Sequence, residues 1–89
     1  MMEEKDLIKI FKAVGNEKRF LILRCLHKKK ELSVGDLSEI VNSPFRSVSK
    51  DLAILRNAEL VKFRNFSFKK RYSINFSKFP KELLSFLES

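Results

Sequence analysis

The chain has 89 residues, 44% apolar and 34% charged, which is the composition of one small globular domain rather than of a disordered segment. Its single cysteine, Cys25, excludes an intramolecular disulfide framework, and no apolar run approaches the roughly 20 residues that span a bilayer. The net charge is +8, and residues 46–72 supply most of it, with eight basic and two acidic side chains. Such a concentration indicates a polyanionic partner, although a solvated surface would also carry it.

The first predicted helix spans residues 3–14 and has acidic residues near its start. Its apolar side chains recur at i, i+3, i+4 and i+7 and therefore share one face: Leu7, Ile10, Phe11 and Val14. Gly15 ends this helix, and Asn16 offers a side-chain cap for the next one. That next helix, residues 17–29, is apolar on nearly every side, which is typical of a central helix with several neighbours.

The end of the central helix carries a run of lysines and two residues with metal-binding chemistry. Residues 28–30 are all lysine, which fits a C-terminal end because cations interact favourably with the helix dipole there. Cys25 and His27 are two positions apart and point to different faces of the helix. We expect Cys25 to be a buried, small apolar residue, with a thiol switch as the weaker alternative, and His27 to lie at the surface or helix end.

Residues 31–41 contain the start of a third helix. Ser33 and Asp36 are three residues apart, the spacing of a capping box. The side chains that we expect to face inward after this start are Leu37, Ile40 and Val41. Asn42 and Ser43 then turn the chain.

A fourth helix is predicted over residues 44–58. Ser43 is a candidate cap, and Pro44 is tolerated at a first helical position. The buried face repeats at i, i+4 and i+7: Val48, Leu52 and Leu55. Two short helices joined by so short a turn form a helix-turn-helix, whose second helix conventionally enters the DNA major groove.

The first turns of the helix over residues 44–58 carry side chains that point mostly away from its buried face. They include hydroxyl, guanidinium and ammonium groups suited to phosphates and base edges, and the candidates are Phe45, Arg46, Ser47, Ser49 and Lys50. We interpret this helix as a DNA-recognition helix. The alternative is an amphipathic core helix with a solvated basic end.

After residue 60 the apolar period changes from about 3.6 to 2, which predicts two half-buried strands. Their apolar positions are Val61 and Phe63 in the first strand and Tyr72, Ile74 and Phe76 in the second. Residues 65–70 form the predicted hairpin loop, and residues 61–75 together form a basic hairpin, or wing, beside the recognition helix. This wing would lie along the DNA backbone or enter the minor groove.

The wing carries both cations and aromatic rings. The cations that we expect to neutralise phosphates are Arg64, Lys69, Lys70 and Arg71, and Lys18 at the start of the central helix adds a candidate backbone contact. Arg19 is a weaker candidate. Phe66 and Phe68 either fold back onto the hairpin or terminal helices, or insert at a base step or stack on an unpaired base.

A closing helix is predicted over residues 77–88, with Ser77 and Pro80 as start signals. Its apolar stripe consists of Phe79, Leu83, Phe86 and Leu87. Because a chain of this size has little core to spare, the stripes of the two terminal helices, 3–14 and 77–88, either pack within one subunit or form a dimer interface. The interface candidates are Leu7, Ile10, Phe11, Phe79, Leu83, Phe86 and Leu87.

The order of these elements resembles the ArsR family of winged helix-turn-helix transcriptional repressors. The segments that carry the resemblance are AVGNEKRFLILRCL (13–26), ELSVGDLSEIV (31–41), SVSKDLAILRNAELV (47–61) and RYSI (71–74). The resemblance implies a mainly α fold with a small β-hairpin, in the order α-α-α-α-β-β-α, as one domain over residues 1–89. It also implies a homodimer that binds double-stranded DNA through an operator, with the terminal helices at the dimer interface.

The sequence departs from this family at two places. Many members bind metals through cysteines in a motif like E-L-C-V-C-D-L, and here Ser33 and Gly35 stand where the thiolates would be. Residues 77–89 contain no histidine, whereas other members bind zinc through acidic and histidine ligands there. One cysteine and one histidine do not supply the roughly four ligands of a zinc site, so we expect no metal and no cofactor. The second departure is the wing tip, which lacks the family's usual glycine.

The sequence therefore predicts a sequence-specific DNA-binding regulator, a dimeric repressor by the resemblance. The alternative is a winged-helix module that binds another protein without specific DNA binding. An enzyme is not expected, because no nucleophile–base arrangement, phosphate-binding glycine loop or paired carboxylates occur. The acidic N-terminal residues differ from the basic start of a signal peptide, so we expect a cytoplasmic protein without a membrane contact.

Overall fold

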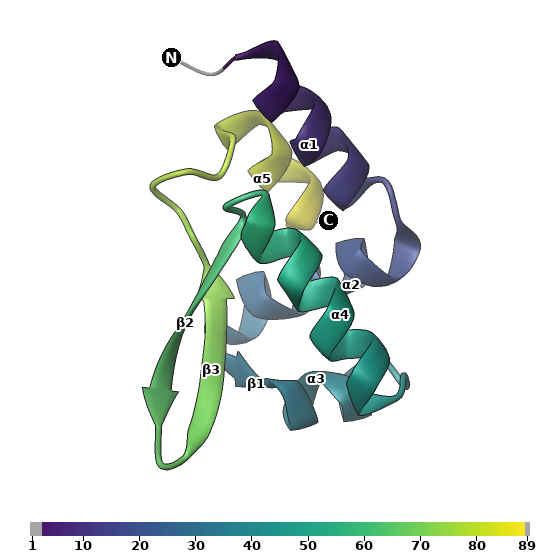
Figure 1. Ribbon diagram of the computed structural model, residues 1–89, viewed down its shortest axis with the longest axis vertical. Helices are drawn as coiled ribbons and strands as arrows, with labels where there is room; N and C mark the ends of the chain where they lie inside the picture. The colour runs from purple at the N-terminus through teal and green to yellow at the C-terminus, as the bar shows by residue number, and fades with distance from the viewer. Residues whose placement is uncertain (1–2, 89) are drawn as a thin grey trace.

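Helices form most of the computed structural model, which describes residues 3–88 (Figure 1). The helices are α1 (Glu4–Val14), α2 (Glu17–Lys29), α3 (Val34–Ile40), α4 (Phe45–Asn57) and α5 (Lys81–Leu87). The strands are β1 (Leu32–Ser33), β2 (Val61–Phe66) and β3 (Lys69–Ile74). The predicted fold class, mainly α with a β-hairpin, is confirmed.

The sheet contains one strand more than the sequence predicted. The short strand β1 pairs antiparallel with β3, with Leu32 opposite Tyr72 and Ser33 opposite Arg71, so the strand order is β1-β3-β2. Ser33 then caps α3, because its Oγ accepts a hydrogen bond from the Asp36 N–H and Asp36 Oδ2 accepts one from the Ser33 N–H, both at 3.1 Å. The predicted capping box is confirmed, and it joins the sheet directly to α3.

Two predicted helix starts are wrong, for the same physical reason. Ser43 does not cap α4, because its backbone groups bond to Ser38 in the turn, and Pro44 takes the cap position. Ser77 does not begin the closing helix. The carbonyl of Asn75 accepts the N–H groups of residues 78 and 79, which keeps residues 75–79 in a turn until α5 begins at residue 81. In contrast, Asn16 accepts the Arg19 N–H at 3.1 Å and caps α2 as predicted.

The core lies between α2, α4 and the inner face of the sheet. Its fully buried side chains include Ile22, Leu23, Leu26, Leu37, Val48, Leu52, Leu55, Leu60, Val61 and Ile74. The predicted buried face of α4 is therefore confirmed. Ile40 was expected to face inward but is exposed, because the seven-residue α3 turns a single row, Leu37 and Val41, toward the core.

The hairpin is longer and its turn tighter than predicted. Pairing continues to Phe66 opposite Lys69, so the loop is the two-residue turn Ser67–Phe68 instead of residues 65–70. Both turn residues have positive φ, 47° and 66°, the backbone of a type I′ turn. Phe76, expected in the second strand, lies beyond β3 and is exposed, with its ring edge against His27.

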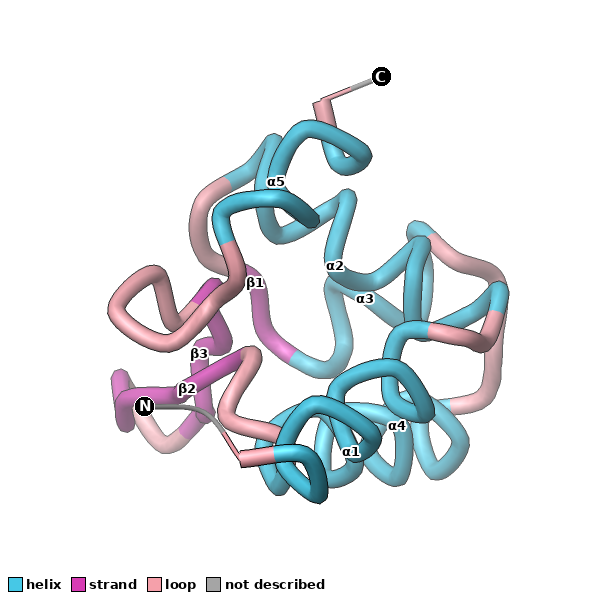
Figure 2. The backbone as a smooth tube through the Cα atoms, turned by 90° about the horizontal axis from the view of Figure 1, so that it is seen from above, coloured by secondary structure: helices cyan, strands magenta, loops and turns pink. Residues whose placement is uncertain are grey.

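The elements divide the molecule into two ends. The terminal helices α1 and α5 lie at one end, and the hairpin tip, β1 and α3 lie at the other (Figure 1). From above, α1 lies over α4 and α5 lies toward the opposite side, where it contacts α2 (Figure 2). Across residues 3–88, no helix combines the length and apolar character needed to cross a membrane.

The capping box makes a testable contribution to stability. Replacing Ser33 with alanine (Ser33→Ala) removes the oxygen that accepts a hydrogen bond from the Asp36 N–H. Ser33 is buried in the structure. We expect the free energy of unfolding, measured in urea at pH 7, to fall by about 1 kcal/mol. The exposed Ser47→Ala is the matched control and should change it little.

Acid should shrink this difference. Hydrogen bonds from the backbone and then the hydroxyl of Ser33 hold the pKa of Asp36 below its usual value. A lowered folded-state pKa gives stability that is present above the unfolded pKa and lost as pH falls through the folded pKa. Ser33→Ala keeps the backbone bond to Asp36 and loses only the hydroxyl, so the wild type should lose slightly more stability than the variant on acidification. An equal loss in both proteins would show that the hydroxyl does not lower the pKa of Asp36.

Candidate nucleic-acid interface

The end of the molecule with the hairpin tip contains a groove. It has a volume of about 460 Å³ and lies between the start of α3, the start of α4 and the hairpin. Hydroxyl, ammonium and aromatic side chains line it, among them Ser33, Phe45, Ser49, Phe68, Lys69 and Lys70. A groove with this lining can bind an anion through its hydroxyl and ammonium groups and contact an apolar group through its rings.

Helix α4 presents its predicted contact residues to solvent. Phe45, Arg46, Ser47, Ser49 and Lys50 are all exposed, whereas the opposite face of α4 is fully buried. A recognition helix requires this exposure, because DNA can contact only side chains that face solvent in the free protein. Their individual contacts with DNA stay a prediction.

Arg19 holds α4 in place. Its Nη1 lies 3.1 Å from Asp51 Oδ1 on α4, and both side chains are largely buried, with 15% and 18% exposed. Its Nε donates to the Ala13 carbonyl at 2.7 Å and its Nη2 to the Lys12 carbonyl at 3.3 Å. This one guanidinium therefore connects the end of α1, the start of α2 and the middle of α4.

Lys18, a predicted backbone contact, has a partner within the chain. Its Nζ donates to the Val41 carbonyl at 3.0 Å, in the turn between α3 and α4. The side chain thus supports the helix-turn-helix turn. Asn42 in the same turn has a positive φ of 52°, which asparagine tolerates better than most residues.

The outer face of the hairpin contains an ion pair that the sequence did not reveal. Glu31 accepts hydrogen bonds from Arg64 Nε at 2.7 Å and Nη2 at 2.8 Å. This pairing lowers the pKa of Glu31 and raises that of Arg64. Arg64 also lies directly opposite Arg71, and both guanidinium groups stack over the ring of Phe66, at 5.0 Å and 5.3 Å. Glu31 and Phe66 together allow two like charges to be neighbours.

The remaining wing cations differ in how free they are. Lys70 places its Nζ 4.7 Å from the centre of the Phe63 ring, on the inner face of the hairpin. Lys69 follows the turn and is exposed. Of the four predicted phosphate contacts in the wing, Arg64 therefore has a carboxylate partner and Lys70 an aromatic one, whereas Lys69 is an exposed cation beside the turn.

The two aromatic residues of the wing behave differently. Phe66 is 46% exposed and lies under Arg64 and Arg71, so it folds onto its own hairpin. Phe68 is fully exposed, at 109% of the reference area. The fold-back expected as one alternative therefore holds for Phe66 and is wrong for Phe68.

The interface candidates on the terminal helices divide into two groups. Leu7, Phe11 and Phe86 are exposed and Leu83 is half-buried. The other three are buried inside this chain, which corrects the expectation that they line a subunit interface: Ile10, Phe79 and Leu87. They fill the space under α1 and α5, because a turn rather than a helix carries Phe79 inward. Ile8, which the sequence analysis did not name, is exposed beside Leu7.

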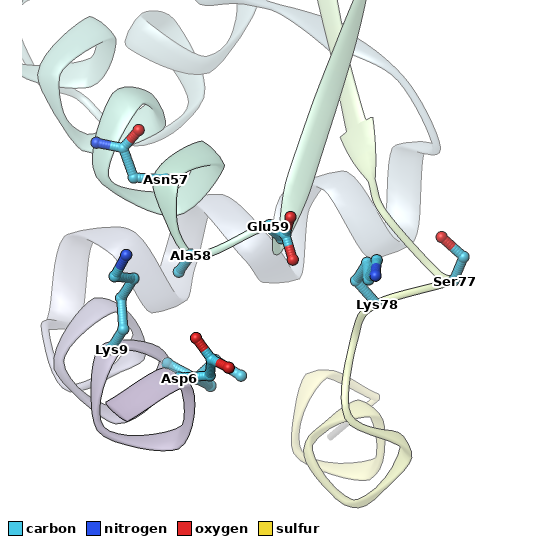
Figure 3. Close-up of a pocket in the computed structure, with 8 residues that line it drawn as sticks. Asp6, Lys9, Asn57, Ala58, Glu59, Ser77 and Lys78 are labelled. Atoms are coloured by element: carbon cyan, nitrogen blue, oxygen red, sulfur yellow. The ribbon is translucent and has the colours of Figure 1, made fainter. Parts of the chain in front are cut away.

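A second pocket lies near the end with the terminal helices. It has a volume of about 450 Å³ and opens between α1, the end of α4 and residues 77–78 (Figure 3). Its charged lining is balanced: Asp6 and Lys9 come from α1, and Glu59 and Lys78 from the two turns. A balanced lining does not attract a polyanion, so the basic groove is the better candidate interface.

The cysteine and the histidine lie away from this groove. Cys25 is partly buried against the core, and burial raises the pKa of its thiol. His27 is half-buried, with its ring centre 6.5 Å from that of Phe76. Within residues 3–88, no three His, Cys, Asp or Glu side chains gather as a possible metal site.

Comparison with known proteins agrees with this geometry. The family model described as "Bacterial regulatory protein, arsR family" matches residues 16–62. The uncharacterized HTH-type transcriptional regulator YceK of Bacillus subtilis is 36% identical over 92 residues, covering 100% of this chain and 92% of YceK. A homolog of the cadmium resistance transcriptional regulatory protein CadC, from Staphylococcus aureus, is 34% identical over 59 residues, covering 66% of this chain. The chain matches only about half, 49%, of that protein's length.

A solved structure extends the comparison to three dimensions. Reduced HlyU from Vibrio cholerae superposes with a TM-score of 0.77 at 31% identity, covering 94% of this chain and 83% of HlyU. The match includes the helix-turn-helix and the hairpin, since so large a share of this chain is covered.

The role of Arg19 can be tested by stability. Replacing it with alanine (Arg19→Ala) leaves Asp51 partly buried without its cation and removes the donor to Ala13. We expect the free energy of unfolding to fall by roughly 2 kcal/mol, measured in urea, because hydrogen bonds to charged groups contribute about 1.5–3 kcal/mol. The exposed Arg46→Ala should stay within about 0.5 kcal/mol of wild type. Equal effects of the two substitutions would show that Arg19 does not anchor α4.

Proposed function

The chain belongs to the arsR family of bacterial regulatory proteins, and on this premise we propose that it is a dimeric repressor that binds a specific site in double-stranded DNA. The observation that carries the proposal is the basic groove. The exposed start of α4 and the basic hairpin lie on its two sides, and residues 46–72 supply eight basic against two acidic side chains. Such a regulator acts in the cytoplasm, where bacterial DNA lies.

The width of α4 fits the major groove of duplex DNA. A helix with its side chains is about 10–12 Å wide, close to the roughly 12 Å of the major groove. With α4 in the major groove, the hairpin beside it meets the next minor groove, and the sugar-phosphate backbone that separates the two DNA grooves runs through the protein's groove. Ser33, Ser49, Lys69 and Lys70 line that path.

Each side chain then has a distinct task. Arg46 and Lys50 project from α4 toward base edges and flanking phosphates, and Ser47 contributes a hydroxyl that suits either. Lys69 and Lys70 neutralise phosphates. Base contacts give sequence preference, and the phosphate contacts set the register of the protein on the duplex.

A second copy of the chain would cover the exposed apolar side chains at the other end of the molecule. These are Leu7, Ile8, Phe11 and Phe86, on the terminal helices. Two copies joined there would present two α4 helices about 34–36 Å apart on a palindromic site. The dimer thereby doubles the number of phosphate contacts.

One observation favours a different function. Phe45 and Phe68 are exposed at the same groove, and exposed aromatic rings often mark a protein-binding surface. A protein-binding winged helix would keep these rings and would not need the surrounding cations.

Fluorescence anisotropy on DNA separates the two functions. The probes are a fragment from upstream of the chain's own gene and a shuffled duplex of equal length, each titrated across a salt series. We expect the native fragment to bind about 10³-fold more tightly, with an affinity that falls steeply as salt increases. Absence of binding to either duplex at low salt would contradict the proposed function and favour the protein-binding module.

The Glu31–Arg64 pair predicts an unusual gain of affinity. Replacing Glu31 with glutamine (Glu31→Gln) removes an acidic group from the outer face of the hairpin and releases Arg64 for a phosphate. We expect tighter binding to both duplexes, and a plot of log affinity against log salt that is steeper by about 0.9 for each added phosphate contact.

Two further substitutions are the controls for this prediction. Lys69→Gln should weaken binding and flatten the salt dependence by about the same amount per contact. Arg64→Gln should have a smaller effect, since Arg64 is already paired. If Arg64→Gln weakens binding as much as Lys69→Gln, the ion pair does not hold Arg64 back from DNA.

A further inference from the structure

The tip of the hairpin contains a residue that the fold itself does not need. Phe68 has a φ of 66°, in the left-handed region where non-glycine residues cost roughly 1–2 kcal/mol. Type I′ turns favour asparagine and glycine at their two positions, and here they contain Ser67 and Phe68. The Phe68 ring is fully exposed, so it returns no burial energy to the chain.

The surroundings of Phe68 indicate what its ring contacts. Lys69 follows it directly, Lys70 lines the same groove, and Arg71 lies farther along the strand. Phe66, the other exposed ring of the hairpin, is held by two guanidinium groups and stays on the strand. Phe68 is therefore a single apolar ring at the end of a cationic hairpin. This combination suits a polyanion that offers an apolar site between its charges, which in a duplex is a base step.

The position of the tip selects the minor groove. With α4 in the major groove and the backbone along Ser49 and Lys69, the hairpin tip points into the next minor groove, which is about 6 Å wide. Apolar side chains in the minor groove, phenylalanine among them, insert between base pairs, partly unstack them and kink the duplex.

We propose that Phe68 is an aromatic wedge that inserts into a base step in the minor groove beside each half-site and kinks the DNA there. This inference rests on the proposed function and adds a determinant of specificity to it. Pyrimidine–purine steps such as TA and CA/TG unstack most easily, so the wedge would favour sites with such a step under the tip. The protein would thus select sequence at a position where it makes no base-edge hydrogen bond.

The test uses a variant that should fold at least as well as the wild type. Glycine populates positive φ without a steric cost, so Phe68→Gly relieves the backbone and removes the ring together. We expect its urea midpoint to equal or exceed that of the wild type. Phe76→Ala, which removes an exposed ring on the loop after β3, is the matched control.

Three readouts are taken on the duplex from upstream of the gene, with 2-aminopurine placed at successive steps. Wild-type protein should raise 2-aminopurine fluorescence at a step beside each half-site and shorten the end-to-end distance measured by energy transfer. Phe68→Gly should lose both effects and bind about 10-fold more weakly, in line with the energy of stacking one base on an aromatic ring. Its salt dependence should be unchanged because no charge is removed, and Phe76→Ala should behave as wild type.

The outcomes separate this inference from the proposed function. If the wild type binds the duplex and Phe68→Gly binds and bends it equally well, the wedge is overturned and the regulator stands. If Phe68→Gly weakens binding to single-stranded dT30 as much as to the duplex, the ring stacks on unpaired bases and the wedge is again overturned. If the wild type binds no duplex, both proposals fail.

Discussion

The guanidinium of Arg19 is the contact on which the arrangement of the helices depends. A short chain has few buried side chains to fix the angle between helices, and α1, α2 and α4 meet at one guanidinium that donates to three oxygen atoms, the carbonyls of Lys12 and Ala13 and the carboxylate of Asp51. Breaking it exposes a partly buried aspartate on α4, the helix whose other face must stay free for DNA. The anchor lies on the inner side of α4, so it orients the helix without using any of the residues that face solvent.

Charge on the hairpin is arranged differently from charge on α4. At the start of α4, Arg46 and Lys50 are exposed, whereas two arginines of the hairpin, Arg64 and Arg71, are arranged around Phe66 and Glu31. Arg64 and Arg71 face each other across the two strands and would repel. Stacking on the Phe66 ring and the nearby Glu31 carboxylate offset this repulsion. A hairpin held in this way stays extended, which keeps its tip, Phe68 and Lys69, at one side of the groove.

Local patterns in the sequence predicted much of this structure, and contacts between distant residues account for the rest. The caps at Asn16 and at Ser33 with Asp36 depend on neighbours three residues away, so their spacing was sufficient. Ser43 and Ser77 have the same chemistry, but they bond to other near neighbours, Ser38 and Asn75, in turns that replace the predicted caps. The pairing of Glu31 with Arg64 joins residues 33 positions apart, and no periodicity reveals it. The exposure of the α4 contact residues followed from helical spacing, whereas the tight turn at Phe68 did not, because phenylalanine is unusual at positive φ.

Strand β1 has a consequence for how such a protein can respond to a signal. Ser33 both pairs with Arg71 in the sheet and caps α3. No linker therefore separates the sheet from the first helix of the helix-turn-helix. The hairpin is therefore joined to the start of α3 through one paired and capping residue, which restricts changes in the angle between the hairpin and the helix-turn-helix. Within the proposed dimer, the remaining freedom is the rotation of one whole subunit against the other. Such a rotation would change the spacing between the two half-sites while each half-site contact stayed intact.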